Sequence, residues 1–193
     1  DGPVALVLSS YMRSDANEEL ARAAVLYEPP LADKDHIVEV HSLRLLDEEV
    51  AERVDFDTAD EMTVDVELVI RKPTEGMRLG VEIRTEEGGL LMQSFIGEHS
   101  DDALPSRLLS GRYSMRLKLP GGLFTGGQYR LMPAVAIHGV RWLIRDTQGV
   151  AFSMAFSVPS GRYLFPRREG YIAPILPWEV SIDSEAVTEW DVR

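Results

Sequence analysis

Histidines are the first residues to test for chemistry, because the sequence contains four of them and no cysteine. They are His36, His41, His99 and His138. The positions of His36 and His41 differ by an odd number, so an extended strand would direct them to opposite faces, away from a shared metal. We therefore expect surface or strand-end histidines and no zinc site. Without cysteine, a thiolate zinc site, an iron–sulfur centre, a cysteine nucleophile and a disulfide scaffold are excluded.

The other combinations of reactive residue types have the wrong spacing for catalysis. Residues 98–101 read Glu-His-Ser-Asp, but neighbours in one loop rarely converge as a triad, and the sequence has no G-x-S-x-G elbow. The acidic pairs 86–87 and 101–102 lie side by side, whereas a glycosidase needs two carboxyls across a cleft. The glycine-rich stretch 121–127 lacks the Lys-Ser/Thr of a phosphate-binding loop. The sequence thus predicts no enzymatic activity, no metal and no cofactor.

A binding surface is the chemistry that the pattern favours, on a strand expected over residues 128–138. One register of this strand looks buried, and the other reads Arg130, Met132, Ala134, Ala136 and His138. Two alanines on one face would leave a shallow trough. Sugar rings stack on aromatic faces, while arginine and histidine hydrogen-bond to hydroxyls or carboxylates. The predicted carbohydrate-binding residues are Arg130, Met132, His138, Arg141 and Trp142, with Arg112 and Arg116 as neighbours if their strands pair in one sheet. The alternative, with Trp142 in the core and the alanines as filler, remains open.

Most of the chain has the two-residue period of β-strands. The clearest alternation runs over residues 62–71, where Val64, Val66, Leu68 and Ile70 share one face. Further strands are expected over residues 37–45, 77–85, 90–95, 112–119, 128–138, 142–144, 151–158 and 171–180. Glycine and proline separate these segments, and residues 97–111 form a long loop. The pattern predicts an all-β protein with an antiparallel β-sandwich over residues 36–193.

The N-terminal segment has a different period. Residues 3–27 place apolar side chains at helical spacing, beginning with Pro3 in the first turn and ending before Pro29 and Pro30. We therefore expect a helical arm over residues 1–35 in front of the sandwich.

Charge is distributed unevenly along the 193 residues, whose formal net charge is −12. Residues 1–60 hold 15 acidic and 5 basic side chains, a net of −10, whereas residues 104–168 hold one acidic and ten basic ones, a net of +9. Such asymmetry indicates an anionic partner, two parts of one assembly facing each other, or simply solvated strand faces. It favours an acidic or substituted sugar as ligand. Nucleic acid is disfavoured, because the protein as a whole is acidic.

Several motifs, taken in order, resemble one known family. Residues 56–60 precede a strand, residues 80–85 lead into Gly88-Gly89, and residues 111–113 open the strand that ends at Leu119-Pro120. Residues 123–131 are similar to an L-x-x-G-x-Y-x-L corner, residues 156–158 to an F-x-V strand and residues 170–178 to a closing strand from Gly to Trp. Residues 2–11 look like the last helix of a transporter ATPase domain. Together, residues 38–178 resemble the C-terminal carbohydrate-binding domain of the ATPase subunit of O-antigen ABC transporters, the Wzt type.

This resemblance implies an immunoglobulin-like sandwich that recognises the completed end of a lipid-linked polysaccharide. It also implies a homodimer, in which terminal strands may be exchanged, and partners in a transporter ATPase domain and a membrane subunit. No Walker motif is present, so ATP hydrolysis would require a part outside this sequence. Residues 181–193 extend beyond the closing strand of the family.

The sequence also predicts where the protein lies in the cell and leaves one alternative function open. The sequence has no stretch of 18 apolar residues and no secretion signal at its start, so a cytoplasmic protein is expected, peripheral to the inner membrane through the transporter. The alternative function is a structural adaptor whose sandwich and acidic arm dimerise or dock another protein.

Overall fold

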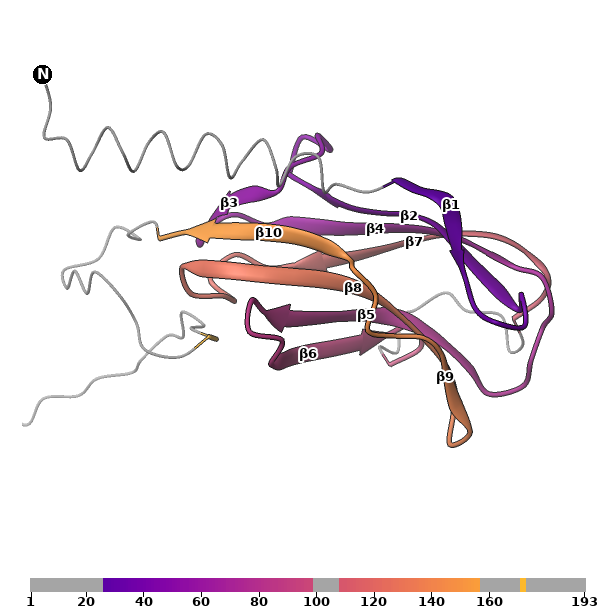
Figure 1. Cartoon of the computed structure of the whole chain (residues 1–193). Helices are drawn as coiled ribbons and strands as arrows, with labels where there is room; N and C mark the ends of the chain where they lie inside the picture. The colour runs from indigo at the N-terminus through magenta and orange to yellow at the C-terminus, as the bar shows by residue number, and fades with distance from the viewer. Residues whose placement is uncertain (1–25, 99–107, 157–170, 173–193) are drawn as a thin grey trace, which may run out of the picture.

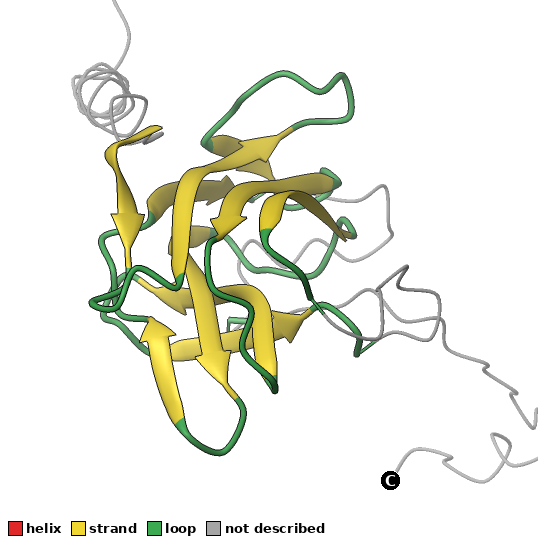
Figure 2. Ribbon diagram, turned by 90° about the vertical axis from the view of Figure 1, so that its right-hand side faces the viewer, coloured by secondary structure: helices red, strands yellow, loops and turns green. Residues whose placement is uncertain are grey.

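The computed structural model describes residues 26–98, 108–156 and 171–172, and every regular element in these ranges is a β-strand (Figures 1 and 2). The strands form two sheets, which pack face to face as a sandwich. The predicted all-β class is confirmed.

The four-stranded sheet has the order β1-β2-β4-β7, and all its neighbours are antiparallel. Its strands are β1 (Leu26–Ala32), β2 (Val38–Leu46), β4 (Met62–Ile70) and β7 (Gly111–Leu119). The predicted alternation of residues 62–71 is confirmed, because Val64, Val66, Leu68 and Ile70 all face the core. Asp65, between them, points to the outer face.

The six-stranded sheet has the order β3-β10-β8-β5-β6, with β9 pairing to β8 beside this path. Its strands are β3 (Asp55–Asp57), β5 (Met77–Thr85), β6 (Leu90–Phe95), β8 (Gly127–Ile137), β9 (Arg141–Ile144) and β10 (Val150–Ala155). β3 and β10 run parallel, so the sandwich is not antiparallel throughout. The sequence pattern did not predict the three-residue strand β3.

The core lies between the two sheets and is made of the inward registers of their strands. Tyr129, Phe124 and Phe152 form an aromatic group within it, with ring centroids 5.3 to 6.3 Å apart. Tyr129 also donates a hydrogen bond of 2.9 Å to the carbonyl oxygen of Thr125. The buried register of β8 is thereby fixed, so its opposite register faces outward.

The helical arm is not supported by the structure. Residues 26–32, which the arm included, form β1 and pair with β2. Pro29 and Pro30 lie in this edge strand, between the paired positions Leu26 and Leu31, where the register shifts. An edge strand tolerates proline because the missing N–H is not needed by a second neighbour. Residues 1–25 lie outside the described residues.

The predicted strand at residues 171–180 is described only at its start. Ile172 forms an isolated bridge with Phe124, and the amide of Thr125 donates to the carbonyl oxygen of Tyr171 at 3.2 Å. Residues 173–180 lie outside the described residues. Within the described part of the chain there is no helix that could span a lipid bilayer.

Candidate binding site on the six-stranded sheet

The outer face of the six-stranded sheet combines the polar register of β8 with that of β5. Backbone pairing sets Arg78 opposite Ala136, Gly80 opposite Ala134 and Glu82 opposite Met132. On the far side of β5, strand β6 sets Phe95 opposite Gly80. Small residues therefore occupy the middle of this face, and longer side chains surround them.

A hollow of about 320 Å³ lies at one end of this face, and we call it the tryptophan hollow. Its lining comes from β5, β6, β8 and the β8–β9 turn: Arg78, Gln93, Phe95, Ala136, Ile137, His138, Gly139, Val140, Arg141 and Trp142. Apolar carbon and hydrogen-bonding groups thus line the same hollow, as in sites for small polar ligands.

Trp142 lies at the wall of the tryptophan hollow, because β9 places it opposite Ala136 of β8. Its side chain is not part of the core: the residue is 38% exposed. The Phe95 ring lies 6.2 Å from it, centroid to centroid, at an interplanar angle of 35°. The guanidinium carbon of Arg145 lies 4.3 Å from the centroid of the Trp142 ring. The cation covers part of the indole, and the exposed remainder is available to a ligand.

Phe95 is held at this wall by its contacts to β5. Gly80 has no side chain, and a Cβ there would lie only 2.0 Å from the carbonyl oxygen of Ser94 and 2.8 Å from the Phe95 ring. The guanidinium carbon of Arg78 lies 4.3 Å from the Phe95 ring centroid. Arg78 also donates to Glu98 at 2.6 Å, and Glu98 accepts the Phe95 amide at 3.0 Å. The two aromatic rings are therefore in contact with one arginine each.

Glu82 is the buried carboxylate behind this wall, with 1% of its side chain exposed. It accepts hydrogen bonds from Arg84 at 2.7 Å, Arg145 at 3.0 Å and Gln93 at 2.6 Å. Burial alone would raise the pKa of Glu82, but the hydrogen bonds from Arg84 and Gln93 and the charges of Arg145 and Arg84 outweigh it and lower the pKa. The ionised carboxylate fixes Gln93 and Arg145 beside Trp142.

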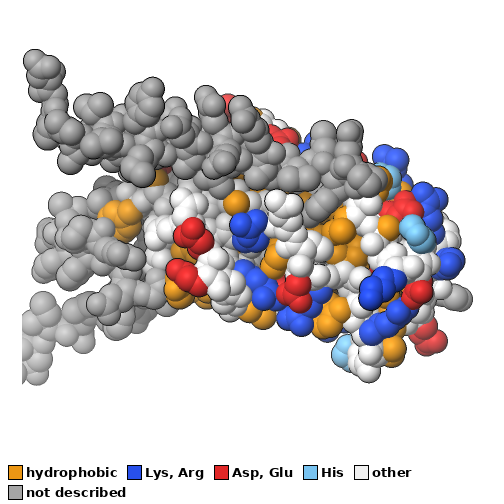
Figure 3. Space-filling view, viewed as in Figure 1, with side chains coloured by type: hydrophobic (Ala, Val, Ile, Leu, Met, Phe, Trp, Pro, Cys, Tyr) orange, Lys and Arg blue, Asp and Glu red, His pale blue; other side chains and the backbone are white. Residues whose placement is uncertain are grey.

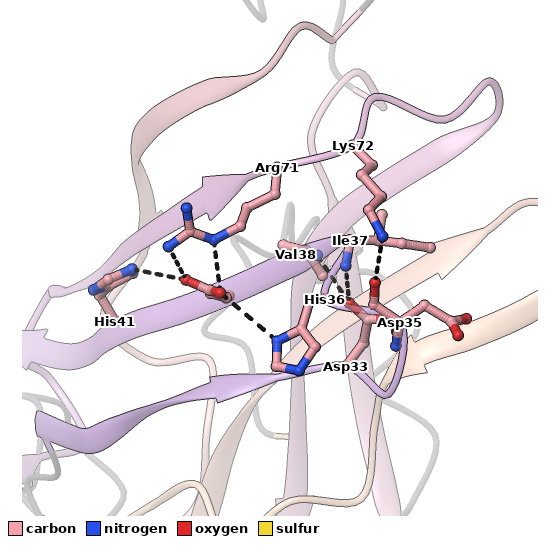
Figure 4. A network of polar contacts seen from close by, with 9 residues as sticks. Asp33, Asp35, His36, Ile37, Val38, His41, Arg71 and Lys72 are labelled. Atoms are coloured by element: carbon pink, nitrogen blue, oxygen red, sulfur yellow. Dashed lines mark hydrogen bonds and ion pairs between the residues drawn. The ribbon is translucent and has the colours of Figure 1, made fainter.

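Arg141 is tied to the turn between β1 and β2 by an ion pair with Asp35. Figure 4 shows how this turn is built: Asp33 accepts the amides of Ile37 and Val38 at 2.6 and 2.8 Å, and Lys72 donates to the Asp35 carbonyl oxygen at 3.0 Å. The hydrogen bond and the charge of Arg141 lower the pKa of Asp35. The ion pair thereby links the β9 hairpin to the four-stranded sheet.

The structure brings only part of the predicted site together. His138, Arg141 and Trp142 line the tryptophan hollow. Arg130 and Met132 lie further along β8, next to the β9–β10 connection, which contacts both and covers Met132. Arg130 donates to the Gln148 carbonyl oxygen at 2.7 Å, and Met132, 4% exposed, lies so close to Gly149 that a Cβ there would be 2.6 Å from its Cγ.

Arg112 and Arg116 do not join this face. Their strand, β7, belongs to the four-stranded sheet, so the condition for their being neighbours of β8 is not met. Arg116 instead donates to Asp65 at 2.8 Å, and Arg44 contacts the same carboxylate. Burial alone would raise the pKa of Asp65, but the hydrogen bonds from Arg116 and Arg44 outweigh it and lower the pKa. The basic stretch of the sequence is thus divided between opposite sides of the sandwich.

Sequence reasoning missed Arg78, Gln93 and Phe95. A usable signal was present, because residues 77–85 and 90–95 were both expected as strands and Arg78 lies in the polar register. Gly80 within an alternating strand also indicates a close approach of another backbone. The pairing of β5 with both β6 and β8, which unites these residues, requires the tertiary structure.

The prediction that His36 and His41 face opposite sides is wrong. His36 lies in the turn before β2, with a φ of 50°, and the register of β2 shifts between Val40 and Ser42. Both rings therefore approach Glu39, at 3.9 and 3.8 Å, as Figure 4 shows. Arg71 donates two hydrogen bonds of 2.7 Å to this carboxylate. Across the described residues, no group of three or more acidic or histidine side chains is arranged to hold a metal ion.

A second hollow, of about 490 Å³, lies over the four-stranded sheet beside Arg116 and Lys118. Its remaining lining includes Asp47, Glu48, Glu61 and the exposed Val50, and no aromatic side chain. It lacks the flat apolar surface on which a sugar ring packs. The tryptophan hollow is therefore the stronger candidate.

The fold and this site define the chain as an all-β sandwich with an aromatic and polar hollow on the outside of one sheet. No family model and no curated protein matches the sequence. Fourteen chains of known structure match the fold, and among them is the crystal structure of the C-terminal domain of Wzt. That similarity covers 82% of this chain and 96% of that chain, with a TM-score of 0.60 and 12% sequence identity. The structural resemblance expected from the sequence motifs is thus confirmed at the level of the fold.

Proposed function

We propose that this chain is a non-catalytic carbohydrate-binding module and that the tryptophan hollow is its binding site. The observation that carries the proposal is the partly exposed Trp142 beside Gln93, His138 and two arginines in one hollow. Aromatic carbon packs against the C–H face of a pyranose, while amide, imidazole and guanidinium groups hydrogen-bond to its hydroxyls. Trp142, Arg141 and His138 are retained from the sequence prediction, and Arg78, Gln93 and Phe95 are added.

The biological ligand we propose is the terminus of a lipid-linked O-antigen-type polysaccharide, bound for export by an ABC transporter. Two observations support it: the order of the sequence motifs, and a fold shared with the C-terminal domain of Wzt over 96% of that domain. The partners in this proposal are the transporter ATPase domain and its membrane subunit. They would hold the module in the cytoplasm at the inner membrane.

A titration with glycans tests this function. The protein, labelled for NMR, is titrated with the surface polysaccharide of its source organism and with an unrelated polysaccharide. We expect selective shifts of Trp142 and Gln93 with the native chain, and their loss once its terminal residue has been trimmed. Equal shifts with both polysaccharides, or shifts that survive trimming, would contradict recognition of the terminus.

A second candidate, an adaptor that dimerises, is favoured by apolar exposure at the opposite end of β8. Phe156, Tyr171 and Ile172 are 38%, 50% and 49% exposed. They belong to one neighbourhood, because a Cβ on Gly126 would lie 3.4 Å from Phe156 and Thr125 bonds to Tyr171. Sedimentation over a range of protein concentrations measures self-association. A tight dimer without any glycan binding would favour the adaptor, whereas the proposed module combines a homodimer with glycan binding.

A further inference from the structure

Arginines give the tryptophan hollow the appearance of an anion site, but each of them contacts a carboxylate. Arg78 pairs with Glu98 at 2.6 Å, and Arg141 pairs with Asp35. Next to the hollow, the buried Glu82 contacts both remaining arginines. The complete set of pairs is Arg78–Glu98, Arg141–Asp35, Arg84–Glu82, Arg145–Glu82 and Arg84–Asp146. Four guanidinium groups are thus matched by four carboxylates.

The surface around the hollow reflects this pairing. In Figure 3, basic and acidic side chains lie next to one another at the end of the molecule where Figure 1 places β9. The fields of opposite charges a few ångströms apart largely cancel at longer range, and salt screens what remains beyond the Debye length, about 8 Å at physiological salt. The two arginines that line the hollow, Arg78 and Arg141, therefore present their charge to a ligand only together with the opposite charge of Glu98 and Asp35.

Binding of an anionic ligand would also be opposed by the carboxylates next to the arginines. Glu98 and Asp35 are half-exposed, at 50% and 52% of their side chains, so an anion that approaches Arg78 or Arg141 comes close to a like charge. It would have to displace a charge-assisted hydrogen bond, the stronger kind in proteins. An uncharged hydroxyl group is not repelled by the carboxylate and need not displace this hydrogen bond. It can accept from a guanidinium N–H and donate to the carboxylate beside it.

The apolar part of the lining fits the same ligand. Ala136, Val140 and the open part of Trp142 present carbon to the hollow, and Gln93 adds an uncharged polar group. From these contacts we propose that the tryptophan hollow selects an uncharged glycan, with Glu98 and Asp35 masking the arginines against acidic sugars. This inference rests on the proposed function, and it reverses the preference for acidic sugars that the basic stretch of the sequence suggested.

The masking carboxylates provide the test. Glu98→Gln and Asp35→Asn remove one negative charge each and preserve the side-chain shape, uncovering Arg78 or Arg141. Glu61→Gln is the matched control, because its carboxylate pairs with Lys118 on the other sheet at 3.3 Å. Each protein is titrated by NMR with neutral mannotriose and maltotriose and with the anionic trigalacturonate, at low and at high salt.

For the unsubstituted protein, we expect the neutral trisaccharides to shift Trp142 and Gln93 with little dependence on salt, and trigalacturonate to bind more weakly. Either masking variant should gain about fivefold in affinity for trigalacturonate, the factor that corresponds to roughly 1 kcal/mol for one uncovered surface charge. The gain, followed through the shifts of Trp142 and Gln93, should disappear at high salt, and Glu61→Gln should show no gain at these two residues.

The outcomes separate this inference from the proposed function. Tighter, salt-dependent binding of trigalacturonate by the unsubstituted protein would overturn neutral selectivity and leave glycan binding intact. Masking variants without any gain would overturn the role of Glu98 and Asp35. If neither class of trisaccharide shifts the hollow in any variant, and the native polysaccharide also fails, the proposed function itself is wrong.

Discussion

Arg145 lies over the ring of Trp142, with 4.3 Å between the guanidinium carbon and the ring centroid, while its Nε donates to Glu82 at 3.0 Å. A buried carboxylate thus orients the arginine that covers one part of the indole. Arg145 contacts one part of the Trp142 ring at the wall of the hollow, and the exposed part of the ring stays accessible. Glu82 is therefore a positioning residue for the site, although it does not line the hollow.

Trp142→Ala should weaken glycan binding by about 1–3 kcal/mol, the range for truncating an aromatic anchor. The free energy of unfolding should change by less than about 2 kcal/mol, because the substitution removes a partly exposed side chain with one cation–π contact and one ring contact, to Phe95. Calorimetric titration and urea denaturation measure the two effects. Leu90→Ala is the control, since this exposed leucine on β6 is not among the residues that line the hollow. A cooperative transition shifted far below that of the unsubstituted protein would place Trp142 in the core.

Glu82→Ala should lower the free energy of unfolding by about 3–5 kcal/mol, because it leaves Arg84 and Arg145 beside a buried, empty acceptor site. The matched control is Glu86→Ala, in the exposed turn after β5, with an expected change within about 0.5 kcal/mol. Chemical denaturation gives both values. A loss below about 1 kcal/mol for Glu82→Ala would show that Arg84 and Arg145 form hydrogen bonds with water once the carboxylate is removed.

Acid should destabilise the protein through Asp65 and Glu82. The pKa of each is lower in the folded protein than its ordinary value, 3.8 for Asp65 and 4.5 for Glu82. Their contribution to stability is therefore present above these ordinary values and disappears as the pH falls through the lower, folded values. The free energy of unfolding, measured between neutral pH and pH of about 3, should fall most steeply below these ordinary values.

Asp65→Asn tests the part of this pH dependence that belongs to the four-stranded sheet. This variant should be less stable at neutral pH, because Arg44 and Arg116 lose their shared carboxylate, and its stability should fall less steeply with acid. Glu61→Gln, at the surface beside Lys118, serves as the control. An unchanged acid slope in Asp65→Asn would assign the acid sensitivity to other carboxylates.

Local pattern predicted the long strands that place one register in the core, and the reason is geometric. In β4, β5 and β8 every second side chain enters one core, so alternation survives in the sequence over nine to eleven residues. β1 was not predicted, because its prolines follow an apolar stretch with helical spacing, and this combination is typical of the end of a helix. β3 is only three residues long, too short to show a period.

The candidate site was predictable only where one strand and its following turn contain it. His138, Arg141 and Trp142 are within five residues of each other, so their proximity follows from the chain. Phe95 reaches Trp142 through β6, β5, β8 and β9, a sequence of pairings that no local pattern encodes. For the same reason, Arg112 and Arg116 were wrongly expected beside this site. Alternation predicts the face of β7 on which they lie, but not the sheet to which β7 belongs.

Gly80→Ala tests whether the close approach of β5 and β6 builds the wall of the hollow. Its new Cβ would lie 2.0 Å from the Ser94 carbonyl oxygen, which is part of the backbone of β6 and cannot rotate away. We expect a loss of about 1–3 kcal/mol in the free energy of unfolding, the usual cost of overpacking, together with NMR shifts at Phe95 and Trp142. Gly127→Ala is the control, because its Cβ would meet its nearest atom, Tyr129 Oη, at an ordinary 3.6 Å. If Gly80→Ala kept both its stability and its glycan affinity, β6 could move outward without disturbing the site, and the contact between Phe95 and Trp142 would not be required for binding.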